Sequence, residues 1–583
     1  MAPKLTPTDR LVVGIDFGTT FSGVAAAYSA NPEAPDEINI IKSWPGGNNV
    51  TSDKVPSEIA YGEVAQSPIQ KKPFEDPFDF NPFSTDLDTS QLEAGTTESG
   101  GTMRWGYQIR SDEQRLRCLK LLLDPAQPLP AYVSLDDIQQ QLTATQKNVG
   151  TAVAEYPTSL FDHTKEVLNR RYGEFFVATT KLQVVLTVPA VWSDKAQDAT
   201  VKAAEAAGMG SDIMVISEPE AAAVYALQAI QPNNLKIGHN FVVVDAGGGT
   251  VDLITYSITQ LTPLRLEEVV RGSGGCCGAA FLNVRFEDFI RQKLGSRVFQ
   301  QLRTKKPRSL LVALKYFEDY VKRTFDPQQD DMFNVPFPGV EDNIEAGVDS
   351  VIAVVIRLVD SQMRSVRAMG KSVNALMLVG GFGQSEYLLK SLRSRFNVEI
   401  MQPVNAWTAV VRGAVLRGLE GQELVISRKA RRHYGVKMKT PFNSSIHPDK
   451  VKYWDPLEES LWATNQMTWY IKKGETVSSD ESVLFPFYRC FNSGESRIAL
   501  DNLIVCEDDV APTYASNKTR TACELMVDLN DVPECFWKSA YNSRGIRYQR
   551  LSYHLGMQIT SGGIHFDFRV DGVVYGEVTA SFD

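Results

Sequence analysis

Three glycine-rich turns constrain the fold of this chain more than any other feature of its sequence. They lie in Val13–Thr20, Val244–Asp252 and Leu378–Gly383, and each follows an apolar run typical of a buried strand. Glycine reaches backbone angles closed to other residues, so the main chain can approach a ligand closely. Successive backbone N–H groups then form a cradle for phosphate oxygens. One such turn alone is often structural, but the three together predict a nucleotide between two similar lobes.

The first two turns share one pattern, in which an apolar strand is followed by an aspartate, small residues and a threonine. This likeness suggests an internal duplication with one phosphate loop in each lobe. Asp16 and Asp245 stand at the strand ends, and a carboxylate there suits hydrated Mg²⁺, which keeps several of its waters. The expected phosphate contacts are Gly18, Thr19, Thr20, Phe21, Gly247, Gly248, Gly249 and Thr250.

At these residues the chain resembles the actin-like ATPase superfamily, and within it the seventy-kilodalton heat-shock chaperone family. The resembling segments occur in the family's order. Ile15–Ser22 and Val244–Asp252 are similar to its two phosphate motifs, and Ala375–Ser385 is similar to its adenosine motif. Val188–Trp192 resembles the segment that carries the family's proline switch, and Ile216–Ala223 resembles its first connecting motif.

The resemblance implies an α/β fold with a duplicated actin-like (ribonuclease H-like), two-lobed ATPase domain, followed by a smaller β-rich domain. The expected boundaries are about 10–240 and 395–420 for lobe I, about 241–394 for lobe II, 421–432 for a linker and 433–583 for a β-rich, substrate-binding-like domain. The chain stops at Asp583, so we expect neither the family's helical lid nor its acidic tail. These features resemble the atypical, lidless branch of the family.

The resemblance also implies roles for individual residues. Asp16 and Asp245 would hold the metal through water, Asp245 would help orient the attacking water, and Glu218 would extend this network. The expected catalytic residues are Asp16, Glu218, Asp245 and Asp252. The expected adenosine contacts are Asp319, Lys322 and Arg323 on one helix, and Gly380, Gly381, Phe382 and Gln384 in the third turn. Alternatively, the charged residues of this helix form ion pairs on a solvent-exposed face and do not contact adenosine, because charges three or four residues apart lie on the same face.

One departure from the family pattern bears on hydrolysis. The family places a lysine of lobe I near the γ-phosphate, but the stretch Trp105–Gln108 that aligns there contains none. A missing cation slows phosphoryl transfer, because the developing charge loses its stabilisation. We therefore expect slow ATP hydrolysis, unless Arg104, Arg110 or Lys120 replaces the lysine.

Two functions remain open at the level of sequence. The first is a chaperone-type Mg²⁺-ATPase that signals through Pro189 and the apolar strip Leu424–Ile426 to a β-domain that binds protein clients, regulatory proteins or co-chaperones. The second is a nucleotide-dependent scaffold that does not hydrolyse ATP. A sugar or polyol kinase would share the fold, but nothing after residue 420 resembles a kinase domain.

The amino-acid composition limits which binding partners and which cellular compartment we expect for this protein. The net charge of −10 argues against a general nucleic-acid binder. The sequence contains no apolar run long enough for a membrane span and no signal peptide before the first strand. Seven cysteines without paired C-x-x-C spacing indicate reduced thiols. We expect a cytoplasmic or nuclear monomer with a role in the stress response.

Several local elements are also predicted. A helix should begin after the N-cap Ser193, and another should occupy residues 405–420. Asp571-Gly572 should turn a hairpin. The proline-rich, acidic residues 62–104 should form a surface insertion. Cys276-Cys277 in a glycine-rich stretch allows a redox switch, although packing of small residues in a tight loop is the favoured interpretation.

Overall fold

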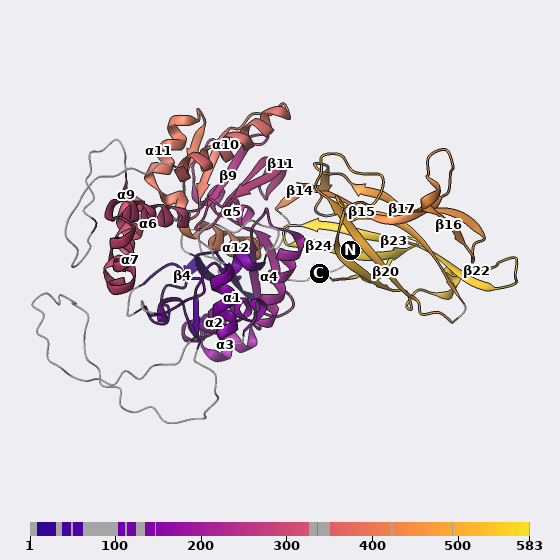
Figure 1. Cartoon of the computed structure of the whole chain (residues 1–583), viewed down its shortest axis with the longest axis horizontal. Helices are drawn as coiled ribbons and strands as arrows, with labels where there is room; N and C mark the ends of the chain where they lie inside the picture. Colours follow the sequence, from indigo (N-terminus) through magenta and orange to yellow (C-terminus); the bar gives the residue numbers. More distant parts are fainter. Residues whose placement is uncertain are drawn as a thin grey trace, which may run out of the picture.

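The computed structural model describes residues 9–30, 38–47, 51–61, 103–110, 113–123, 135–145, 147–325, 335, 350–420, 424–492 and 494–581. An α/β part holds two sheets and the helices around them, and an elongated β-rich part projects from one side of it (Figure 1). Within the part of the chain that the structure describes, no helix has the length and apolar content needed to cross a bilayer.

The first sheet has the strand order β3-β2-β1-β7-β8, with β4 beside β2. Strand β1 pairs antiparallel with β2 and parallel with β7, which is parallel to β8. The strands are β1 Arg10–Asp16, β2 Phe21–Tyr28, β3 Asn39–Ile40, β4 Val55–Pro56, β7 Lys181–Val188 and β8 Met214–Ser217. Both faces of β1 are buried, which explains why its sequence is a continuous apolar run.

The second sheet has the order β13-β12-β9-β10-β11-β14-β18. Its strands are β9 Asn240–Ala246, β10 Val251–Leu261, β11 Leu264–Gly275, β12 Ala375–Val379, β13 Glu399–Met401, β14 Val425–Lys429 and β18 Thr476–Ser478. Strand β9 pairs antiparallel with β10 and parallel with β12. The pairings of β9 therefore repeat those of β1 in the first sheet.

Helices α5 (Glu218–Ala229) and α12 (Ala409–Glu420) lie between the two sheets. One hydrophobic cluster joins both helices to residues of each sheet, including Val12 and Val243. The helices approach closely at Gly413, where a Cβ would lie only 1.7 Å from the carbonyl oxygen of Ala221. The predicted helix over 405–420 is confirmed from Ala409, after a 3-10 turn at Ala406–Thr408.

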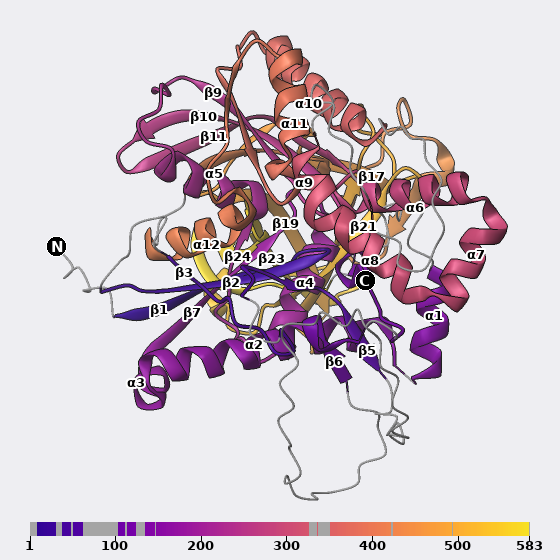
Figure 2. The ribbon, with the colours of Figure 1, turned by 90° about the vertical axis from the view of Figure 1, so that its left-hand side faces the viewer.

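Other helices pack on the outer faces of the two sheets (Figure 2). Three further helices, α6, α7 and α8, share a separate hydrophobic cluster. Ser193 accepts a hydrogen bond from the Ala196 N–H at 3.2 Å, which confirms the predicted N-cap. A 3-10 turn occupies Leu119–Leu123. The helices are α1 Leu135–Ala144, α2 Val149–Tyr172, α3 Glu174–Thr179, α4 Asp194–Ala206, α6 Ala280–Leu294, α7 Ser296–Lys305, α8 Pro307–Tyr316, α9 Lys322–Thr324, α10 Ser350–Ala368 and α11 Glu386–Arg395.

The insertion predicted at 62–104 lies outside the described residues except at its last two positions. There, β6 (Met103–Trp105) pairs antiparallel with β5 (Ile59–Tyr61). The two ends of the segment are therefore joined side by side at the edge of the α/β part.

The β-rich part is a sandwich of two sheets around one core. One sheet has the order β16-β17-β15-β20-β21-β26, and the other has β19-β23-β24-β25 with β22 on β23. The strands are β15 His433–Pro441, β16 Lys452–Asp455, β17 Ser460–Ile471, β19 Val483–Asn492, β20 Ile498–Cys506, β21 Arg520–Asp528, β22 Lys538–Tyr541, β23 Arg547–Thr560, β24 Gly563–Val570, β25 Val573–Glu577 and β26 Thr579–Ser581.

The predicted hairpin at Asp571-Gly572 is confirmed. Both residues have positive φ, 51° and 79°, as a type I′ turn requires. The segment after this turn forms two strands in different sheets. Strand β25 pairs with β24, whereas β26 pairs with β21 in the other sheet.

Candidate nucleotide site

The three glycine-rich turns meet where the two sheets face each other. A Cβ on Gly248 would lie 1.8 Å from Thr20 Oγ1, and one on Gly249 would lie 2.6 Å from Thr19 Cγ2. A Cβ on Gly380, whose φ is +87°, would lie 2.5 Å from Asp245 Oδ1. Only glycine allows these approaches, so the structure brings the three turns together at one place.

Four buried carboxylates line this meeting point. They are Asp16 at the end of β1, Glu218 at the start of α5, and Asp245 and Asp252, which are opposite each other on β9 and β10. The structure thus groups the expected catalytic residues, although they come from four separate elements.

Burial raises the pKa of three of these carboxyl groups. For Asp245 the neighbouring Glu218 and Asp252 charges raise the pKa further. Burial and the Glu218 charge raise the pKa of Asp252 to about 7. Burial also raises the pKa of Glu218, and Lys120 opposes this shift. So much negative charge in a poorly solvated place favours a bound cation.

Two buried lysines stand among these carboxylates. Lys120 Nζ lies 2.5 Å from Glu218 Oε1 and faces the Trp192 ring, with 5.2 Å to the ring centroid. Lys54 Nζ lies 2.6 Å from Asp16 Oδ2. The structure thus places two lysines at this site, although Trp105–Gln108 contains none.

Lys120 was among the replacements foreseen, whereas Lys54 was missed because a lone lysine in a polar segment carries no recognisable signal. Arg104 and Arg110, the other two candidates, both pair with Glu113.

The third turn packs against aromatic side chains. Phe382 is buried, and a Cβ on Gly381 would lie 3.2 Å from Cδ1 of Trp407. Trp407 in turn packs edge-on against Phe21 beside the first turn, with 5.9 Å between ring centroids. Gln384 ends the 3-10 turn that follows. An apolar wall thus connects the first turn with the third.

The helix expected to contact adenosine is only partly described. Lys322 Nζ donates to Glu318 Oε2 at 2.6 Å and to Asn283 Oδ1 at 3.1 Å. The side chains of Asp319 and Arg323 lie outside the described residues. The role of this helix in adenosine binding stays a prediction.

The residues present fit a hydrated magnesium ion and phosphates. Among the described residues, no three histidine, cysteine or carboxylate side chains converge closely enough to hold a metal ion by themselves. Mg²⁺ commonly binds through one or two carboxylates and its own waters. Asp252 Oδ1 is buried without a hydrogen-bond partner in the protein, so a water or ligand atom is needed to satisfy it.

The adjacent cysteines lie near Asp252. Cys277 is buried, and burial followed by the Asp252 charge raises the pKa of its thiol to about 12. The same two causes raise the pKa of Cys276. Both thiols therefore stay protonated, which favours packing over a redox switch because thiolates are the reactive form.

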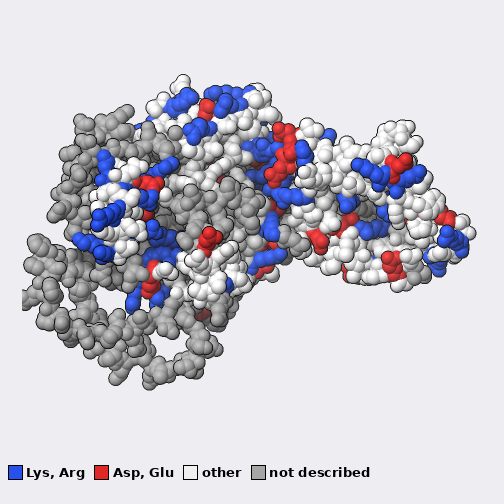
Figure 3. Space-filling view, viewed as in Figure 1, with Lys and Arg blue, Asp and Glu red and all other residues white. Residues whose placement is uncertain are grey.

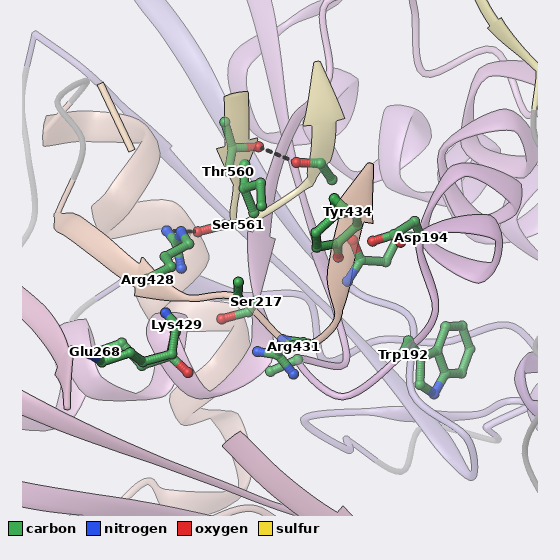
Figure 4. A pocket seen from close by; sticks show the side chains of 15 residues that line it. Trp192, Asp194, Ser217, Glu268, Arg428, Lys429, Arg431, Tyr434, Thr560 and Ser561 are labelled. Atoms are coloured by element: carbon green, nitrogen blue, oxygen red, sulfur yellow. Dashed lines mark hydrogen bonds between the residues drawn. The ribbon is translucent and has the colours of Figure 1, made fainter. Parts of the chain in front are cut away.

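A buried polar junction joins the nucleotide site to the β-rich part. Glu220, two residues after Glu218, is fully buried and lies 3.0 Å from Arg428 Nη2 of β14. Ser561, in the turn between β23 and β24, contacts both side chains. Figure 4 shows Arg428 and Ser561 at a pocket that Trp192, Asp194 and Tyr434 also line.

The predicted linker takes part in this junction as a strand. Strand β14 pairs with β11 and β18, and the Leu424 carbonyl accepts from the Leu266 N–H at 2.9 Å. The apolar strip is thus docked in the second sheet. Residues 421–423, the first three residues of the predicted linker, lie outside the described residues.

Comparisons with known proteins agree with this architecture. Residues 168–428 match the family model of the Hsp70 protein, and residues 428–571 match a domain of unknown function (DUF8568). Human heat shock 70 kDa protein 12A is 23% identical over 81% of this chain and 78% of its own length. Human heat shock 70 kDa protein 12B is 22% identical over 94% of this chain and 88% of its own length.

A match over a smaller part of the chain is to a protein named as a chaperone. The chaperone protein HscA homolog of Acinetobacter baylyi is 26% identical over 40% of this chain and 36% of its own length. The two family models together match residues 168–571. Over these residues the chain is therefore similar to proteins of the Hsp70 family.

Proposed function

We propose that this chain binds Mg²⁺-ATP and ADP between two duplicated lobes, hydrolyses ATP slowly and couples this cycle to protein partners of its β-rich domain. The observation that carries the proposal is the meeting of buried carboxylates and Lys120 at the glycine turns. Similarity to the Hsp70 family supports nucleotide binding with a divalent metal.

The duplication is supported by the two sheets. Each has a central strand that pairs antiparallel with the next strand and parallel with a later one, and each of these strands ends at an aspartate of the site or beside it. We assign the first sheet to lobe I, the second to lobe II, and residues 433–583 to the β-domain.

The proposed roles follow from charge and position. Backbone N–H groups of the first two turns would hold the phosphates, with Thr19, Thr20 and Thr250 adding hydroxyls. Asp16 and Asp245 would hold Mg²⁺ through water, and the ion would neutralise phosphate charge when bound. Asp245 and Glu218 would orient the attacking water. Lys120 would stabilise the charge that develops during transfer.

Coupling to the β-domain is supported by the docked strand β14 and the Glu220–Arg428 contact. Opening of the lobes would move α5, which carries both Glu218 and Glu220. The names of the relatives support a chaperone-like role. We propose that the β-domain binds protein clients, regulatory proteins or co-chaperones. We propose no membrane and no nucleic-acid partner, and a monomer in solution.

A scaffold that binds ATP without hydrolysis remains the second candidate. The observation that favours it is the ion pair between Lys54 and Asp16, because it engages the carboxylate proposed for the metal.

Calorimetry and single-turnover kinetics on the purified full chain test the proposal. We expect Mg²⁺-dependent ATP binding and slow release of phosphate. Binding without phosphate release would favour the scaffold, and the absence of any binding would reject both candidates. Gly248→Val should abolish binding, because its side chain would fill the cradle and strike Thr20. Unchanged affinity in this variant would remove the phosphate-loop assignment.

A further inference from the structure

Lys54 is a buried cation that the family pattern did not predict. It stands just before β4, its side chain is 8% exposed, and its Nζ lies 2.6 Å from Asp16 Oδ2. Asp16 is the carboxylate at the end of β1 that we propose for hydrated Mg²⁺. A fixed ammonium group therefore occupies one oxygen of the carboxylate that the metal would use.

The surroundings hold Lys54 in this position. Its carbonyl oxygen accepts from the Ser52 hydroxyl at 2.7 Å and from the Tyr107 hydroxyl at 3.1 Å. Its side chain passes over Gly23, where a Cβ would lie 3.2 Å from Lys54 Cγ and 3.4 Å from Cε. Strand β4 pairs with β2 immediately afterwards. The missing side chain at Gly23 thus leaves a path along which the lysine reaches Asp16.

The Lys54 charge also acts on the rest of the carboxylate cluster. Burial raises the pKa values of Glu218 and Asp245, and Lys54 opposes both shifts. Lysine is also a common phosphate ligand in proteins, where it acts as a point charge. Its position beside the first glycine turn is compatible with both tasks.

We propose that Lys54 is a built-in cation that takes over part of the role of Mg²⁺, so that this chain binds ATP and ADP with a weak requirement for the metal. The inference rests on the proposed nucleotide binding. In a site without this lysine, Asp16 would face the phosphates as an uncompensated negative charge, and the metal would be needed to overcome the repulsion.

The test is calorimetric titration of ADP into the full chain, once with excess MgCl₂ and once with EDTA. The quantity compared is the ratio of the Kd in EDTA to the Kd with Mg²⁺. We expect Lys54→Met to raise this ratio at least about tenfold over the natural chain, the size expected for loss of a hydrogen bond between charged groups. Lys42→Met is the matched control, because Lys42 pairs with Asp53 on the surface of the same segment.

Gly23→Ala provides a second variant that keeps the lysine charge. Its methyl group should displace the Lys54 side chain and raise the ratio in the same direction by a smaller factor. If circular dichroism shows that Lys54→Met does not fold, Gly23→Ala is the variant that tests the role of Lys54.

The outcomes separate this inference from the proposed function. Equal ratios in the natural chain and in a folded Lys54→Met variant would overturn the role of Lys54 while leaving nucleotide binding intact. If Lys54→Met does not fold, an unchanged ratio in Gly23→Ala overturns it. Absence of ADP binding to the natural chain with Mg²⁺ present would reject the proposed function and this inference together.

Discussion

Lys120 is the residue whose position most affects the proposed chemistry. It is 1% exposed and contacts both Glu218 and Trp192, so its charge lies among groups that water barely reaches. Lys120→Met should lower the single-turnover rate of ATP hydrolysis about 10² to 10³-fold, as loss of one preorganised charge does elsewhere. ATP affinity should change less, because backbone N–H groups and Mg²⁺ still hold the phosphates.

The control for Lys120 is Arg104→Ala, which removes a cation that pairs with Glu113 instead. The control should keep the natural rate. A Lys120→Met variant that binds ATP and hydrolyses it at the natural rate would contradict the role given to this lysine.

Asp252 makes stability depend on pH. Its pKa is about 7 in the folded protein, above the usual value of 3.8, because burial and then Glu218 disfavour the charged form, while Thr250, Lys120 and Arg431 oppose the shift. The folded state therefore binds more protons than the unfolded state between about pH 4 and pH 7, and stability falls as pH rises through this window.

Urea unfolding of the nucleotide-free protein at pH 5 and pH 7.5 measures this effect. The natural chain should lose stability at the higher pH, and Asp252→Asn should lose less, because the amide imitates the protonated acid. An equal loss in both proteins would show that Asp252 ionises normally.

At the scale of elements, the contact between α5 and α12 fixes where Glu218 lies. Gly413→Ala would place a methyl group against the Ala221 carbonyl, at a nominal 1.7 Å, so the helices must separate. We expect a loss of about 1–3 kcal/mol in the free energy of unfolding, as overpacking usually costs. Gly150→Ala is the control, since among the described residues, apart from its chain neighbours and its own helix backbone, the atom nearest to its Cβ is Asn148 Oδ1 at 3.4 Å.

Chemical denaturation of both variants tests this contact. The control should be neutral or gain up to about 1 kcal/mol from helix propensity. Equal stability of Gly413→Ala and Gly150→Ala would show that the helix contact is adaptable.

The elements differ in how well their sequence predicts them. Buried strands such as β1 and β9 are recognisable because both of their faces are apolar, and Ser193 and Asp571-Gly572 act through local backbone chemistry. Lys54 reaches the site through long-range folding, so no local pattern reveals it, and the sequence offers Lys120 only as one of three basic residues that could replace the missing lysine. The strand character of Val425–Lys429 likewise depends on partners distant in the sequence, β11 and β18.

In the whole molecule, charged side chains of both signs gather where the α/β part meets the β-rich part (Figure 3). Arg432 lies 3.1 Å from Asp194 there, and Arg428 lies 3.0 Å from the buried Glu220. Arg428→Met would leave Glu220 without this partner, at a cost of about 3–5 kcal/mol for breaking a buried pair. We expect the two parts to undock and the amides of β14 to exchange faster with deuterium.

A second substitution isolates this junction from general damage. Adding Glu220→Gln to Arg428→Met removes the stranded charge and should recover much of the protection, because removal of both partners costs less than removal of one. Arg489→Met, which breaks a pair with Asp501 inside the β-rich part, should leave β14 unchanged. Natural exchange rates in Arg428→Met would contradict a stabilising role for the junction.

Hydrogen–deuterium exchange of the full chain with and without Mg²⁺-ATP tests the central claim most directly, because it locates the nucleotide on the sequence. The account predicts protection in all three glycine turns together, Val13–Thr20, Val244–Asp252 and Leu378–Gly383, accompanied by changed exchange in β14. Protection confined to other segments, or identical exchange in all three turns with saturating nucleotide, would contradict a nucleotide site between the two lobes.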